Sequence, residues 1–196
     1  MSDTDAISNI SVRRRWFGRL AYAVYWLIIF WTGMHFVGQL ERPAFLQIGD
    51  IEISSPAFQN GQLLDLEYTS YGANINPPLK ISRVPLEAKS LVILADDEEG
   101  YSHWVVWNIS PYISEIAPAV LPAGALEGRN DFETEGYFGA CQATGSKGKK
   151  KYFFSVYALD IMLELKPGVH DYLVIKAMEG HVLAQSRVWA YYDMGM

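Results

Sequence analysis

Residues 103–110, HWVVWNIS, and residues 149–160, KKKYFFSVYALD, are the two stretches that decide the fold. On one face of an extended chain they place Val105, Trp107 and Ile109 in the first stretch and Tyr152, Phe154, Val156 and Ala158 in the second. An apolar period of two is typical of β-strands that turn one face toward a core. Both stretches are therefore predicted to be strands.

Between these strands lies a glycine-rich loop at residues 128–145, GRNDFETEGYFGACQATG. Glycine has no Cβ, so the backbone of such a loop can approach a ligand closely. This loop is the first candidate for part of a binding site.

The rest of the C-terminal part also reads as short strands separated by turns. Strands are expected at residues 45–53 and 63–68, and residues 91–94, LVIL, predict a strand that is covered on both faces. Residues 171–178 have helical spacing, and Gly180 supplies a stop signal. The pattern predicts a mainly β fold, a sandwich of about 150 residues with one or two short helices.

Composition narrows the function classes. The chain of 196 residues has a net charge of −6, which argues against a nucleic-acid-binding surface. Its single cysteine, Cys141, excludes an internal disulfide. A hydrophobic content of 50% fits one domain together with one apolar segment.

The apolar segment lies at residues 20–40, LAYAVYWLIIFWTGMHFVGQL, and as a helix it is long enough to cross a hydrocarbon core of about 30 Å. Four arginines within residues 13–19 precede it, which places the N-terminus in the cytoplasm by the positive-inside rule. We expect a cytoplasmic tail at 1–19, a transmembrane signal anchor at 20–40 and a β domain at 41–196. A cleaved signal peptide is the alternative, but its apolar region would be shorter and would end at small residues.

Four segments, at residues 72–79, 103–109, 128–139 and 152–160, resemble in this order the phosphatidylethanolamine-binding protein family. The chain looks most similar to the bacterial, Raf-kinase-inhibitor-like branch of that family. The resemblance implies the family's antiparallel β-sandwich. Together with the anchor, it implies a domain on the periplasmic side of a bacterial inner membrane.

Members of this family hold an anion, typically phosphate or a carboxylate, in a small pocket at one end of the sheet. The resemblance implies that His103 and Tyr152 donate hydrogen bonds there and that the carboxylate of Asp96 orients the donors. It also implies that the backbone of Gly139 and Ala140 lies at the rim of the pocket.

This sequence departs from the family pattern within the same pocket. The family's prolines are missing from residues 96–100 and 139–143, and Lys150-Lys151 replaces a histidine–arginine pair. Lys150 would therefore bring an ammonium group to the place of an imidazole. Anion binding remains an expectation, through an altered set of donors.

The same residues could also carry two other chemistries. Acidic residues 96–99 could suggest a divalent cation, but consecutive carboxylates on an extended chain point to alternate faces, and a solvated loop is preferred. His103 with Cys141 could suggest a nucleophile, but the sequence has no nucleophile elbow. We expect no catalysis, no metal and no cofactor.

Two functions follow. The first is a membrane-anchored binding protein for phosphate, a carboxylate or a phospholipid headgroup. The second is an accessory or assembly subunit of a membrane protein complex, in which the family fold serves as an interaction surface. A ligand-carrying pocket would favour the first, and stable membrane partners would favour the second.

Overall fold

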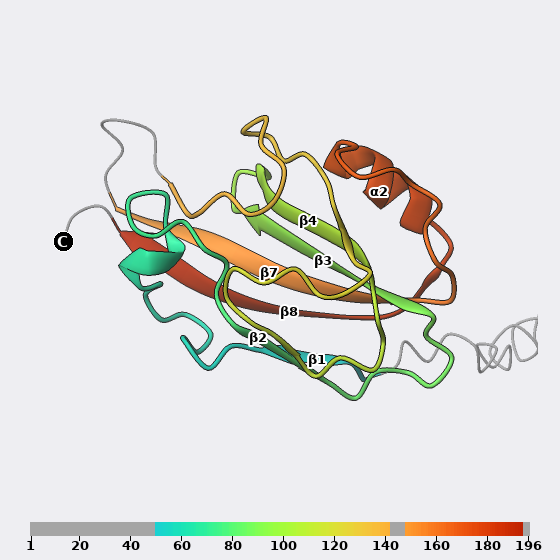
Figure 1. Ribbon diagram of the computed structural model, residues 1–196. Helices are drawn as coiled ribbons and strands as arrows, with labels where there is room; N and C mark the ends of the chain where they lie inside the picture. The colour runs from blue at the N-terminus through green and yellow to red at the C-terminus, as the bar shows by residue number, and fades with distance from the viewer. Residues whose placement is uncertain (1–49, 142–147, 194–196) are drawn as a thin grey trace, which may run out of the picture. The chain divides into compact units, whose positions relative to one another are not determined.

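Alternating apolar and polar residues fold into two antiparallel sheets in the computed structural model, which describes residues 50–141 and 148–193 (Figure 1). One sheet has five strands in the order β6-β4-β3-β7-β8, and the other has three in the order β1-β2-β5. The strands are β1 (Glu52–Ser54), β2 (Leu79–Ser82), β3 (Ser90–Asp97), β4 (Ser102–Ile109), β5 (Glu115–Ile116), β6 (Leu126–Glu127), β7 (Lys149–Leu159) and β8 (Val182–Asp193).

The main core lies between the two sheets. It contains all four apolar residues that alternate along β7, which are Tyr152, Phe154, Val156 and Ala158. Residues of the smaller sheet, such as Leu79 and Ile81, pack against them from the other side. Burial of each large apolar side chain contributes about 1.5–3 kcal/mol, so this layer holds the two sheets together.

A second apolar layer lies on the outer face of the five-stranded sheet. There the helix α2 (Asp171–Met178) covers part of β3 and β4, and its bounds agree with the helical spacing of the sequence (Figure 1). Val92 and Leu94 pack beneath the helix, whereas Leu91 and Ile93 face the main core. The absence of alternation in LVIL reflects this burial on both faces.

Two local expectations differ from the structure. A strand was expected at residues 63–68, but residues Leu66–Tyr68 form a short 3-10 helix, η2. The backbone there makes hydrogen bonds between residues three apart, such as that from the Tyr68 N–H to the Asp65 carbonyl. Ile109 does not share a face with Val105 and Trp107. A register shift in β4 between Val106 and Ile109 directs the Ile109 side chain into the main core. Val105 and Trp107 face α2 instead.

The prediction of a mainly β fold with antiparallel sheets and a short helix is confirmed. The predicted tail at 1–19 and the predicted anchor at 20–40 lie outside the described residues. Within residues 50–141 and 148–193, no helix is both long enough and apolar enough to cross a membrane.

Candidate functional site

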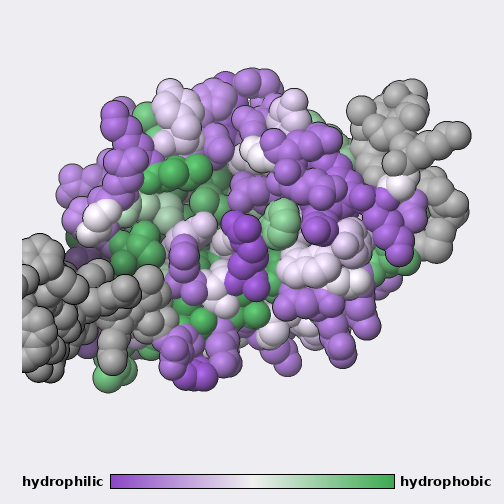
Figure 2. Space-filling model, turned by 180° about the vertical axis from the view of Figure 1, so that it is seen from behind, coloured by the Kyte–Doolittle hydropathy of each residue, from purple (hydrophilic) through white to green (hydrophobic). Residues whose placement is uncertain are grey.

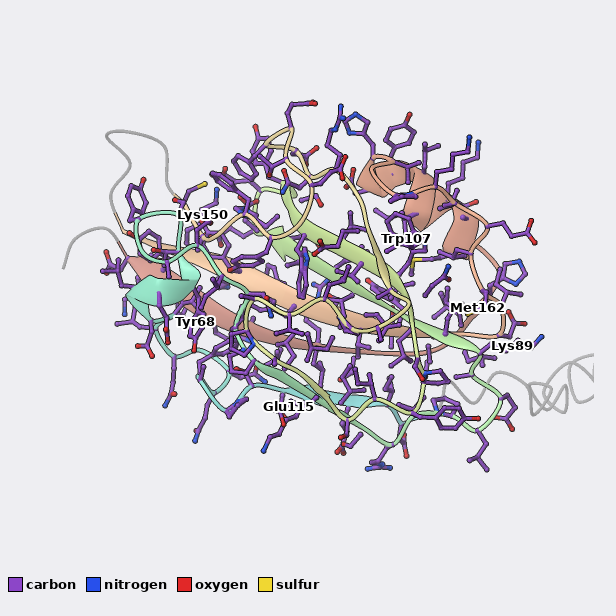
Figure 3. All side chains as sticks on the ribbon, viewed as in Figure 1. Tyr68, Lys89, Trp107, Glu115, Lys150 and Met162 are labelled. Carbon is purple, nitrogen blue, oxygen red and sulfur yellow. The ribbon has the colours of Figure 1, made fainter. Side chains whose placement is uncertain are left out.

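The candidate site forms at the end of the five-stranded sheet where β3 ends and β4 and β7 begin. Asp97 is the last residue of β3, and it pairs across the sheet with Tyr152 of β7. Lys150 precedes Tyr152 by two residues on β7, so its side chain projects from the same face. Figure 3 shows Lys150 at this end of the molecule and Lys89 at the opposite end.

A β-bulge aims His103 at this face. Ala95 pairs with Trp104 and Asp96 pairs with Ser102, so His103 is an extra residue between the two pairs. The side chain of such an extra residue can point to the same face of the sheet as that of the next residue, here Trp104. The imidazole of His103 thereby reaches Asp97. The register shift therefore brings together residues that a regular strand would separate.

Asp97, and not the expected Asp96, is the acid that contacts His103. Its Oδ2 lies 3.4 Å from Nε2 of His103 and 2.6 Å from Nζ of Lys150. Side chains alternate along a strand, so the carboxyl of Asp96 lies on the opposite face. There burial raises its pKa, and the positive charge of Arg187 lowers it. The sequence prediction placed the acid one residue too early.

Asp97 is a fixed structural carboxylate. Its side chain is 1% exposed, and Oδ1 accepts hydrogen bonds from the backbone N–H groups of Glu99 and Tyr101 at 2.9 and 3.0 Å. Burial raises the pKa of this carboxyl, but hydrogen bonds from His103, Lys150 and Tyr101 together hold it well below its usual value. Asp97 is therefore ionised at neutral pH.

Lys150 bridges two carboxylates that differ in exposure. Its Nζ lies 2.9 Å from Oε2 of Glu99, in addition to its contact with Asp97. Burial lowers the pKa of the ammonium, but the two carboxylates raise it above its ordinary value. The Glu99 side chain is 62% exposed, whereas that of Lys150 is 14% exposed. Lys150 thus has one buried partner and one partner at the surface.

Aromatic rings hold the imidazole of His103 in place. Its Nδ1 lies 2.8 Å from the carbonyl oxygen of Phe138, so the Nδ1–H donates to that carbonyl and Nε2 points to Asp97. Phe132 lies 4.7 Å from the imidazole between ring centroids, and Tyr152 meets it edge-on at 5.1 Å. Phe132 and Phe138 stack on each other at 4.3 Å and form the wall beside the histidine.

Tyr152 uses its hydroxyl to fix the adjacent loop. The backbone N–H of Cys141 donates to the tyrosine oxygen at 3.0 Å, and the hydroxyl donates to the carbonyl of Cys141. Burial raises the pKa of this hydroxyl far above its usual value. Tyr152 therefore lies beside His103, and its hydroxyl donates to the chain itself and not to a free position.

Gly139 and Ala140 pack behind this loop against residues 69–70. A Cβ on Gly139 would lie 2.4 Å from the carbonyl carbon of Thr69, so only glycine fits there. The N–H of Gly139 donates to Oδ1 of Asn74 at 2.7 Å, and the carbonyl of Ala140 accepts from Ser70. These two residues shape the rim through backbone contacts.

Sequence reasoning missed three members of the site, namely Asp97, Glu99 and Phe132. Asp97 and Glu99 belong to the acidic residues 96–99, but the sequence did not show which of these carboxylates would contact Lys150. Phe132 belongs to the glycine-rich loop, where buried Asn130 ties the loop to β4 by donating to the carbonyl of His103 at 3.3 Å. An asparagine beside glycines in a long loop was the available signal.

The site offers a cation and hydrogen-bond donors, and its cysteine is a poor nucleophile. Burial raises the pKa of the Cys141 thiol, which lowers its thiolate fraction at neutral pH. In the described residues, no group of three or more histidine, cysteine, aspartate or glutamate side chains is arranged to hold a metal ion.

Comparison with known proteins identifies the family. The sequence profile of the phosphatidylethanolamine-binding protein family matches residues 54–193. The chain belongs to this family. A UPF0098 protein of Pyrococcus horikoshii is 37% identical over an alignment of 172 positions, and the alignment covers 82% of this chain and 83% of that protein.

Solved structures of family members have the same fold. A phosphatidylethanolamine-binding protein homologue of Chlamydia trachomatis superposes with a TM-score of 0.67 at 34% identity, covering 73% of this chain and 97% of that one. YbcL of E. coli, described as a member of the mammalian PEBP family, has a TM-score of 0.69 at 26% identity and covers 74% and 98%. The β domain of this chain therefore corresponds to nearly the whole of each of these family members.

Proposed function

We propose that this family member is a non-catalytic, membrane-anchored binding protein whose pocket holds a small oxyanion. The ligand class is phosphate or a carboxylate, free or carried by a phospholipid headgroup. We also place the protein in the bacterial, Raf-kinase-inhibitor-like branch, on the strength of the four sequence segments that resemble it.

The proposal rests on one observation: Lys150 pairs with one buried carboxylate, Asp97, and one exposed carboxylate, Glu99. Asp97 is buried and is held by Lys150 and by two backbone N–H groups, so it stays in place when a ligand enters. Glu99 is exposed, and an exposed ion pair contributes about 0–1 kcal/mol. Its carboxylate occupies a position that an external oxyanion can take from it at little cost.

The remaining groups fit an anion better than a substrate undergoing reaction. Lys150 has three N–H donors, which suit the oxygens of an anion. Charge-assisted hydrogen bonds of this kind are about twice as strong as neutral ones. Among the described residues of this site, burial raises the pKa of the Cys141 thiol, and the chain itself engages the Tyr152 hydroxyl.

The predicted anchor at residues 20–40 would hold this domain at a bacterial inner membrane, with the N-terminus in the cytoplasm and the domain in the periplasm. Within the described residues, the site lies at the end of β3 marked by Asp97.

An accessory subunit of a membrane complex is the second candidate. Two large apolar side chains, Leu86 and Tyr112, are 98% and 94% exposed in the loops after β2 and β4, away from the pocket. Such residues can contact a partner. On the face seen in Figure 2, however, apolar residues occur in small groups among hydrophilic ones, which favours the binding protein.

Purification of the full-length chain from its native membrane in a mild detergent distinguishes the two candidates. Mass spectrometry would identify the small molecules and proteins that elute with it. An organic or inorganic oxyanion that is retained by the wild type and lost from Lys150→Met would support the binding protein. Membrane proteins in stoichiometric amounts, with no anion, would overturn it in favour of the accessory subunit.

A further inference from the structure

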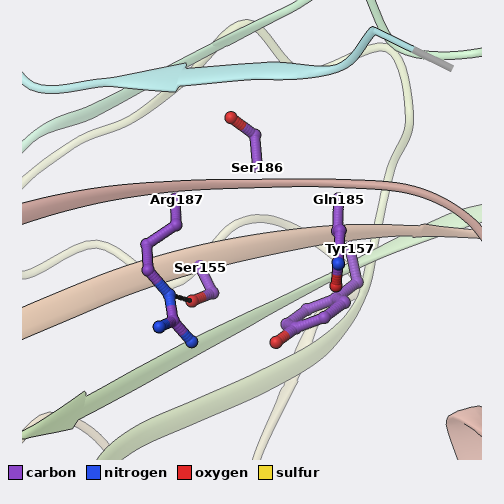
Figure 4. Close-up of a pocket in the computed structure, with 5 residues that line it drawn as sticks. All are labelled: Ser155, Tyr157, Gln185, Ser186 and Arg187. Atoms are coloured by element: carbon purple, nitrogen blue, oxygen red, sulfur yellow. Dashed lines mark hydrogen bonds between the residues drawn. The ribbon is translucent and has the colours of Figure 1, made fainter. Parts of the chain in front are cut away.

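The outer face of β7 and β8 carries a second hollow, separate from the family pocket. Its volume is about 410 Å³, and its lining residues are Ser155, Tyr157, Gln185, Ser186 and Arg187 (Figure 4). Tyr152 and Phe154 of β7 point to the main core, so the odd-numbered residues of this strand point to the other face. The hollow and the family pocket thus lie on opposite faces of the same sheet.

Strand register sets the side chains of this hollow side by side. Ser155 pairs with Arg187 and Tyr157 pairs with Gln185, so these four side chains project together from one face. Figure 4 shows Arg187 and Ser155 joined by a hydrogen bond, with Tyr157 and Gln185 next to them and Ser186 directed to the other side.

Arg187 is exposed, and two contacts orient its guanidinium. Its Nε–H donates to Oγ of Ser155 at 2.9 Å, and Ser155 is 2% exposed. The guanidinium lies over the ring of Phe153, 4.7 Å from its centroid. No hydrogen-bond partner of the two terminal nitrogens is found in residues 50–141 and 148–193. A guanidinium fixed at one edge, with its other edge open, is prepared for a bidentate contact.

We propose that this hollow is a second binding site, which takes the carboxylate of a small organic molecule on the terminal nitrogens of Arg187. A planar carboxylate matches the two parallel N–H groups of the guanidinium. The Tyr157 hydroxyl and the Gln185 amide, one step along the strands, can then donate to a second polar group of the ligand.

The groups around the hollow carry charges of both signs. Lys151 lies on the same face, with its ammonium 5.6 Å from the ring of Trp189. Burial raises the pKa of Asp96, on β3, to about 6, and the positive charge of Arg187 lowers it. At pH 7.5 an ionised Asp96 therefore competes with the ligand for the guanidinium, and its removal would strengthen binding.

The test is an NMR titration of the full-length chain in a mild detergent at pH 7.5, with sodium succinate as the probe and neutral succinamide as its control. The side-chain Nε–H signal of Arg187 and the backbone amide of Cys141 report on the two sites separately. We expect succinate, but not succinamide, to shift the Arg187 signal to saturation.

Two variants complete the experiment, with backbone shifts of the hollow residues as the readout. Arg187→Lys keeps the positive charge but removes the two parallel N–H groups of the guanidinium. It should weaken succinate binding by about tenfold or more. Asp96→Asn should strengthen it. A saturable shift at Cys141 without one at the hollow would overturn the second site, as would unchanged affinity in Arg187→Lys.

Discussion

Asp96 and Asp97 are neighbours in the chain, but β3 directs their carboxyl groups to opposite faces of the five-stranded sheet. Asp97 meets His103 and Lys150, and its pKa is held far below the usual value. Asp96 lies on the face of Arg187, and burial raises its pKa to about 6. A displacement of one residue therefore separates a member of the candidate site from a carboxyl whose pKa is shifted in the opposite direction.

Asp96 should make the folded protein less stable as pH rises. Burial raises its pKa to about 6, with Asp171 and Asp97 also raising it and Arg187 and His103 lowering it. Because the unfolded pKa is about 3.9, this contribution is complete below about pH 4 and is lost as pH rises through 6, up to about 3 kcal/mol. Thermal unfolding of Asp96→Asn between pH 4 and 8 should show a smaller fall than the wild type.

Asp97 should act in the opposite direction. Its folded pKa lies below the unfolded value of about 3.9, so its contribution is present above pH 4 and is lost as pH falls below that value. Asp97→Asn should therefore reduce the loss of stability on acidification below pH 4. An acid transition that is identical in this variant and in the wild type would contradict the assignment.

Asp97→Asn should also destabilise the fold at neutral pH. The substitution leaves the mostly buried ammonium of Lys150 without its fixed partner, which costs about 3 kcal/mol. The matched control is Glu99→Gln, which removes the exposed partner of the same lysine at a cost of about 0–1 kcal/mol. Equal free energies of unfolding for the two variants, measured in urea, would refute the distinction between them.

Tyr152→Phe should loosen the loop that forms the rim. The variant leaves the buried ring in place but removes both hydrogen bonds to Cys141, at a cost of about 1–3 kcal/mol. Tyr112→Phe is the control, because that side chain is 94% exposed. Hydrogen exchange of the Cys141 amide should accelerate in the first variant only.

Membrane topology can be tested with reporter fusions in bacteria. Alkaline phosphatase fused after residue 196 should be active, because the predicted anchor places the C-terminus in the periplasm. The same enzyme fused after residue 12, before the basic cluster and the anchor, should be inactive. Activity of both fusions or of neither would contradict the predicted orientation.

Periodicity predicted the long strands β4 and β7, but it failed at residues 63–68, because burial depends on alternation only where the chain is extended. The apolar residues of β7 and the bounds of α2 follow directly from it. The orientation of His103 does not, since it depends on a register shift between β3 and β4. A sequence shows which residues alternate, but it does not show where one strand gains an extra residue.

The same limit explains the members of the site that were missed. The strand alternation that separates Asp96 from Asp97 was known in principle, but its phase depends on where β3 begins and how it pairs with β7. The contact between Lys150 and Glu99 joins residues that lie 51 positions apart. Such contacts follow from tertiary structure and leave no local pattern.

Calorimetric titration of inorganic phosphate into the full-length chain tests the central proposal most directly. The wild type should bind phosphate, Glu99→Gln should bind it up to about fivefold more tightly because the internal competitor is gone, and Lys150→Met should lose binding. Absence of binding in both the wild type and Glu99→Gln would contradict the proposed oxyanion pocket, and so would an affinity that Lys150→Met leaves unchanged.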